Sequence, residues 1–110
     1  MDDETRIIRK TASSFAYLFW LSGVRRGDHA PLKADGSTIG RGKDADIMVD
    51  DDTVSAEHAR IRKEGEEWYA YDLASKNTTT VAGQAAYRRL LADGDRLSIG
   101  ETQMAFRVLK

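Results

Sequence analysis

Three short polar groups in this chain contain side chains that can hydrogen-bond a phosphate, and each group follows a strand-like run. They are Gly40-Arg41, Ser55-Ala56-Glu57-His58 and Ser75-Lys76-Asn77. A phosphate ester is close to a dianion at neutral pH and offers three acceptor oxygens. A pocket for it needs a permanently charged planar donor, a small hydroxyl or amide donor and backbone N–H groups. The three groups supply these types, provided that the fold brings their loops to one place.

The elements that must position these groups are short strands. From Phe15 onward, β-type runs are separated by turn residues at close spacing, which is typical of a sandwich or barrel. Strands are expected at 15–21, 30–33, 37–39, 47–49, 58–62, 68–71, 79–81, 96–99 and 104–109. Asp35-Gly36 predicts a hairpin leading into 37–39, and Asp93-Gly94 predicts a turn before 96–99. Residues 85–91 are expected to form loop and strand, because no window of eleven residues or more keeps a helical stripe.

Composition narrows the class of protein. The 110 residues amount to one domain, and a net charge of -1 argues against coating nucleic acid or an anionic membrane. The absence of cysteine excludes disulfides and thiolate metal sites. The longest apolar run, 15–21, is too short to span a bilayer, and the acidic residues 2–4 stand where a signal peptide is basic. We therefore expect a cytoplasmic protein with a flexible polar tail at 1–14 and a domain at 15–110.

Four ordered blocks of this sequence resemble forkhead-associated (FHA) domains. They are 38–50 around Gly40-Arg41, 54–61 around Ser-x-x-His, 71–83 with Asp-Leu-x-Ser-x-Asn, and 90–100 with Leu-x-Asp-Gly-Asp. The resemblance implies an all-β sandwich of two antiparallel-rich sheets with binding loops at one end. It also implies a module that binds phosphothreonine peptides downstream of a Ser/Thr kinase, without catalysis, cofactor or metal.

The resemblance assigns a role to each residue of the three groups. Arg41 would bind the phosphate as a charged fork, and Ser55 would donate its hydroxyl to a phosphate oxygen. Lys76 would contact phosphate or peptide, and Asn77 would hydrogen-bond the peptide backbone. Gly40 and His58 would support the binding loops.

The sequence departs from the family pattern at two positions. Thr78 stands where the family has a glycine, and a β-branched residue is strained if that position needs a positive φ. Ala56 stands where a longer polar side chain often adds a peptide contact. These departures keep open an alternative, a phosphate-independent scaffold or oligomerisation domain that retains only the fold.

Other chemistries receive less support. Ser55 with His58 suggests a hydrolase, but there is no nucleophile-elbow sequence, and the other histidine, His29, lies in an expected loop. The acidic residues between 44 and 52 suggest calcium, yet no glycine-centred twelve-residue loop closes with a glutamate. The Gly-x-Gly at 40–42 lacks a following helix for a dinucleotide, and Lys43 lacks the Ser or Thr of a P-loop.

A further hypothesis concerns Thr5, which follows the acidic residues 2–4 and precedes Ile8 by three residues. Acidic residues before a threonine suit some kinases, and FHA domains often select an aliphatic residue three positions after phosphothreonine. Phosphorylated Thr5 would then bind this chain's own pocket, or that of a second copy. The expected partners are thus a phosphothreonine protein, a Ser/Thr kinase or its substrates, and a second copy of this chain.

Overall fold

A computed structural model describes residues 15–109, which form eleven strands and no helix. The strands are β1 (Ala16–Trp20), β2 (His29–Pro31), β3 (Ser37–Gly40), β4 (Ile47–Met48), β5 (Ala59–Glu64), β6 (Glu67–Asp72), β7 (Thr80–Val81), β8 (Gln84–Ala85), β9 (Arg89–Leu91), β10 (Arg96–Ile99) and β11 (Thr102–Val108). Because the described range holds no helix, it also holds no helix able to cross a membrane. The expected tail at 1–14, with Thr5, lies outside the described residues.

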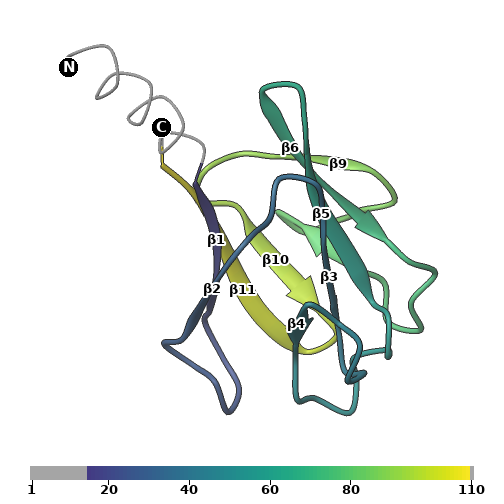
Figure 1. Ribbon diagram of the computed structural model, residues 1–110. Helices are drawn as coiled ribbons and strands as arrows, with labels where there is room; N and C mark the ends of the chain where they lie inside the picture. The colour runs from purple at the N-terminus through teal and green to yellow at the C-terminus, as the bar shows by residue number, and fades with distance from the viewer. Residues whose placement is uncertain (1–14, 110) are drawn as a thin grey trace.

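The strands form two sheets that face each other (Figure 1). One has the order β2-β1-β11-β10-β7-β8, and the other has the order β4-β3-β5-β6-β9. Every pair is antiparallel except β3 with β4, which run parallel. The predicted all-β sandwich of antiparallel-rich sheets is therefore confirmed.

The core lies between the sheets, where alternate residues of each strand point inward. The inward positions of β1 are buried, as are those of β11 up to Phe106, and Leu18 stands opposite Phe106 in the register. Trp68 of β6 meets Phe106 from the other sheet, with ring centroids 6.2 Å apart. Burying these large side chains on both layers holds the sheets together and leaves their connecting loops to carry polar groups.

One sequence prediction about connectivity was wrong. Asp35-Gly36 does not close a hairpin, because β2 pairs with β1 in one sheet while β3 pairs with β4 and β5 in the other. The turn instead passes the chain from one layer to the next. The short-range signal could not reveal this, since a turn residue fixes local backbone geometry and not the sheet that the next strand joins.

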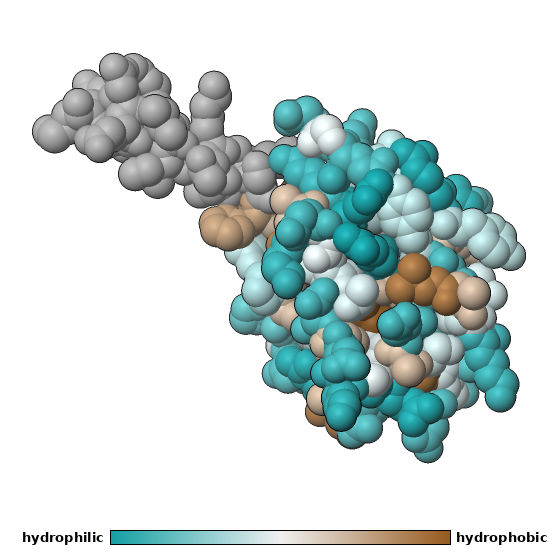
Figure 2. All heavy atoms as spheres, turned by 45° about the vertical axis from the view of Figure 1, so that its right-hand side comes forward, coloured by the Kyte–Doolittle hydropathy of each residue, from teal (hydrophilic) through white to brown (hydrophobic). Residues whose placement is uncertain are grey.

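Most of the exterior is polar, as expected for a chain with 32% charged residues. Figure 2 shows one face on which hydrophilic side chains dominate and hydrophobic atoms occur in small separate groups. The Asp93-Gly94 turn before β10 and the strands in 84–91 agree with the sequence prediction.

Candidate functional site

Three loops meet at one end of the sandwich and bring together the polar groups that the sequence singled out. They are the β3–β4 loop (41–46), the β4–β5 loop (49–58) and the β6–β7 loop (73–79). The Arg41 amide donates to the Ser55 carbonyl at 2.9 Å, and its Nε donates to the Val54 carbonyl at 3.0 Å. The Lys76 amide donates to Ser55 Oγ at 3.0 Å. Ser55 is therefore the common contact of the other two loops.

Gly40 permits this close approach. A Cβ at this position would lie 2.0 Å from the Ala56 carbonyl oxygen, a backbone atom that no side-chain movement can displace. The absence of a side chain lets the β3 end pack against the β4–β5 loop, so the position requires glycine for space and not for a positive φ.

His58 lies under the loops with a fully buried ring. Its Nδ1 accepts a hydrogen bond from the Ser55 amide at 3.0 Å. Burial lowers its pKa below the ordinary 6.5, although nearby Asp72, the Asn77 backbone and Asp51 oppose part of this effect. Because Nδ1 is occupied by an amide and not by the Ser55 hydroxyl, the pair lacks the nucleophile–base contact of a hydrolase.

The β6–β7 loop is organised by a residue whose role the sequence analysis missed. The Asp72 carboxylate accepts hydrogen bonds from the Ser75 amide and hydroxyl and from the Thr79 amide and hydroxyl. Partial burial raises the pKa of Asp72, but these four hydrogen bonds outweigh it and keep the pKa below its ordinary value. The Asp-x-x-Ser spacing is the sequence signal for such a turn.

A second carboxylate, also missed, supports the β4–β5 loop. Asp51 accepts from the Thr53 amide and hydroxyl and from the Thr102 hydroxyl of β11. The Thr53 carbonyl in turn accepts from Asn77 Nδ2 at 2.7 Å. Asp51 thus ties this loop to the start of β11, and the Asp-x-Thr spacing was the available signal.

The exposed parts of this assembly are hydrogen-bond donors. Arg41, Lys76 and Asn77 are exposed, and Ser55 is partly exposed. Ser55 Oγ already accepts a backbone N–H, so its own hydroxyl proton is available to a ligand. Within residues 15–109, no ion pair engages the terminal nitrogens of Arg41, and no cluster of acidic residues or histidines is arranged to hold a metal.

The departure at Thr78 causes no backbone strain. Its φ is not positive, and the left-handed residue of this loop is Ala74, with a φ of 55°. The turn therefore differs from the geometry that would demand glycine after Asn77. Ala56 is exposed and adds no polar group to the site.

Comparisons with known proteins place this fold and loop arrangement in a family. The family described as "Inner membrane component of T3SS, cytoplasmic domain" matches residues 20–109. The glycogen accumulation regulator GarA of Mycolicibacterium smegmatis is 36% identical over 94 residues, which make up 86% of this chain and 60% of GarA. The chain thus spans little more than half the length of this curated relative.

Two solved structures are similar at the level of a whole domain. One, from a study of phosphothreonine-dependent FHA domain interactions, has a TM-score of 0.81 and 32% identity, covering 88% of this chain and 99% of that chain. The FHA domain of FhaA, complexed with the intracellular domain of a second protein, has a TM-score of 0.76 and 34% identity, covering 84% and 99%. This chain belongs to the FHA domain family.

Proposed function

We propose that this chain binds phosphothreonine peptides at its loop end and serves as a non-catalytic adaptor in Ser/Thr kinase signalling. The observation that carries the proposal is the hydrogen bond from the Arg41 amide to the Ser55 carbonyl, which holds the two residues side by side. The terminal nitrogens of Arg41 and the hydroxyl proton of Ser55 remain available as donors to a ligand. A guanidinium held through Nε presents its two terminal nitrogens, which suit a phosphate dianion. The Ser55 hydroxyl adds an uncharged hydrogen-bond donor beside the Arg41 guanidinium.

Lys76 and Asn77 extend this site along a bound peptide. Lys76 supplies a mobile positive charge, while Asn77 is fixed through its amide nitrogen on the Thr53 carbonyl. Its side-chain oxygen remains an acceptor for a peptide N–H, and a second amide hydrogen remains a donor. Gly40 and His58 act indirectly, because one creates space for the β4–β5 loop and the other holds the Ser55 backbone.

The relatives support the same reading. GarA is named as a regulator, and the FHA domains of the two solved structures are described in phosphothreonine-dependent or protein-bound contexts. The proposal includes residues 15–110 as the binding domain and a cytoplasmic location, where kinases and their substrates meet. Binding of phosphorylated Thr5 stays a prediction.

The test is binding of the full chain to a degenerate phosphothreonine peptide pool, measured beside unphosphorylated and phosphoserine pools. We expect binding only to the phosphothreonine pool, and Arg41→Ala should weaken it about 10- to 150-fold, the loss of hydrogen bonds to a charged group. Arg26→Ala is the matched control, because Arg26 is an exposed arginine in the β1–β2 loop and belongs to none of the three binding loops.

Equal binding to phosphorylated and unphosphorylated pools would contradict the proposal and favour the phosphate-independent scaffold. Equal losses in Arg41→Ala and Arg26→Ala would indicate a general charge effect in place of a defined pocket. A strong preference among flanking residues in the bound pool would identify the class of partner.

A further inference from the structure

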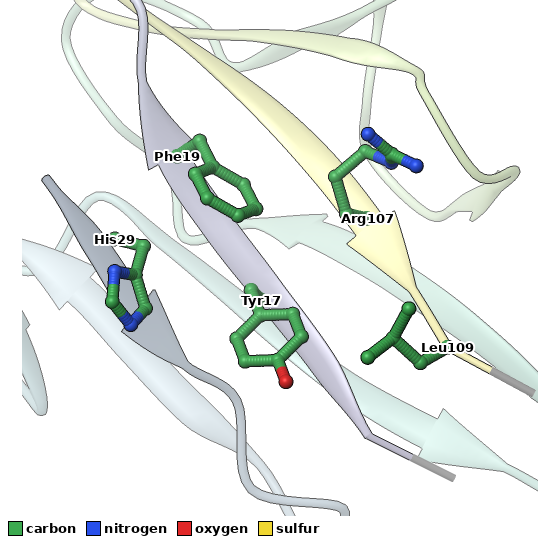
Figure 3. A pocket seen from close by; sticks show the side chains of 5 residues that line it. All are labelled: Tyr17, Phe19, His29, Arg107 and Leu109. Carbon is green, nitrogen blue, oxygen red and sulfur yellow. The ribbon is translucent and has the colours of Figure 1, made fainter. Parts of the chain in front are cut away.

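A second concave surface lies on the outer face of the six-stranded sheet. Figure 3 shows this pocket, which is lined by Tyr17, Phe19, His29, Arg107 and Leu109 and has a volume of about 320 Å³. Tyr17 and Phe19 come from β1, His29 from the neighbouring β2, and Arg107 from β11 on the other side. The pocket therefore spans three adjacent strands, and we refer to it as the aromatic pocket.

The three rings of the aromatic pocket form a continuous cluster. The ring centroids of Tyr17 and Phe19 lie 5.9 Å apart, and His29 lies 5.9 Å from Tyr17 and 5.7 Å from Phe19. Leu109 beside them is 52% exposed. His29 is exposed, and Tyr17 and Phe19 are half-buried. The solvent side of a sandwich sheet ordinarily carries polar residues, and a cluster of rings that reaches solvent there is typical of a protein-interaction site.

Arginine side chains outnumber carboxylates around the aromatic pocket. The outward-facing residues of β1, β2, β10 and β11 include two arginines, Arg96 and Arg107, and no carboxylate. Asp93, from the turn before β10, accepts from Arg107 Nε at 2.8 Å and neutralises part of its charge, while the two terminal nitrogens of this guanidinium have no partner among residues 15–109. Aromatic residues and arginine are also the types enriched where protein interfaces have their strongest contacts.

The position of the pocket separates it from the phosphate site. None of its residues belongs to the three binding loops, and Phe15 and Leu109, at the two ends of the described chain, pair beside it. In Figure 1 the start of β1 and the end of β11 lie in the upper part of the molecule, whereas the loop that follows β3 lies at the bottom. One ligand can therefore occupy the loop end while another contacts the sheet face.

The mode of docking follows from the edge strand. Among the strands within residues 15–109, β2 pairs only with β1 and forms the edge of its sheet, but Pro31 cannot donate to an added strand. A partner would thus bind through side chains packed against the rings, with its own charges beside the arginines.

We propose that the aromatic pocket is a second docking site, for a partner segment that carries a large apolar side chain flanked by carboxylates. The apolar side chain packs against Tyr17, Phe19 and Leu109, and a flanking carboxylate pairs with the Arg107 guanidinium. This contact does not require phosphorylation. It would let the adaptor engage one partner at two places.

The test uses the ¹⁵N-labelled full chain and two synthetic hexapeptides, each with a Leu-Phe centre flanked by glutamates or by lysines. We expect amide shifts concentrated in β1, β2 and the end of β11. The glutamate peptide should bind at least about fivefold more tightly than the lysine peptide, because the charge pairs attract in one case and repel in the other.

Two variants separate the apolar and charged contributions. Phe19→Ser should weaken both peptides, whereas Arg107→Gln, on the surface, should remove most of the preference for glutamate and leave the fold intact. Arg26→Gln should change neither affinity, and Arg41→Ala should leave both peptides unaffected while weakening phosphopeptide binding about 10- to 150-fold. Equal affinity for the two peptides, shifts centred on the loops, or no saturable shift with either peptide would overturn the proposal.

Discussion

His58 couples the charge state of one buried ring to the shape of the binding loop. The neutral imidazole accepts the Ser55 amide hydrogen through Nδ1, and a protonated ring cannot do so. Since burial lowers the pKa of His58, the unfolded chain takes up a proton at a higher pH than the folded chain does. Stability is therefore fully present above about pH 6.5 and falls as the pH drops below that value.

We expect the free energy of unfolding, measured with urea, to fall between pH 7.5 and pH 5.5. His58→Gln should flatten this dependence, because a glutamine side chain accepts the amide hydrogen without titrating. Asp51 and Asp72 do not interfere, since their pKa values lie below the ordinary carboxylate range and their protonation begins at a lower pH. A wild-type slope as flat as that of the variant would contradict the role given to His58.

At the scale of elements, the turn of the β7–β8 hairpin places an alanine in a backbone conformation that alanine disfavours. Val81 pairs with Gln84, so the turn has two residues, Ala82 and Gly83, with φ values of 51° and 82°. Positive φ at both positions is the signature of a type I′ turn, which favours asparagine followed by glycine. Alanine in the left-handed region is strained by the contact of its Cβ with the backbone.

Ala82→Asn should therefore raise the free energy of unfolding by about 0.5–1 kcal/mol, measured by urea denaturation. The Ala82 amide, which donates to the Arg96 carbonyl, is kept in this variant. Ala92→Gly provides the opposite control: Ala92 has no positive φ, so glycine should only add freedom to the unfolded chain and destabilise. A gain in both variants would exclude left-handed strain as the cause.

The sequence predicted most strands and turns correctly, but it did not predict the loop contacts or the sheet that each strand joins. The β-type runs at 96–99 and 104–109 and the turn at Asp93-Gly94 predicted strands where they occur, because side-chain period and turn chemistry are local properties. The loop partners of Asp51 and Asp72 were missed, since an acidic residue in a loop is ordinarily solvated. The crossing at Asp35-Gly36 was mispredicted because sheet membership depends on contacts distant in sequence.

At the scale of the whole molecule, the binding loops and the aromatic pocket are joined through a packed core and share no residue. Arg41 and Ser55 lie on loops that adjoin β3 and β5 of the five-stranded sheet, whereas Tyr17 and Phe19 belong to the opposite, six-stranded sheet. Substitutions at sites without a common partner usually contribute additively, within about 0.3–0.5 kcal/mol. The sandwich is thus expected to act as a rigid spacer between two independent contacts.

Phe19→Ser should accordingly change the dissociation constant of a phosphothreonine peptide by less than about twofold, as measured by calorimetry. A peptide that joins the phosphothreonine segment to the glutamate-flanked segment through a flexible linker should bind about 10²- to 10⁴-fold more tightly than either segment alone, provided that the linker spans the sites. This gain should disappear in Phe19→Ser and in Arg41→Ala separately, because each variant removes one of the two contacts. A linked peptide that binds no better than its phosphothreonine half, at every linker length tried, would show that the sheet face does not take part in binding.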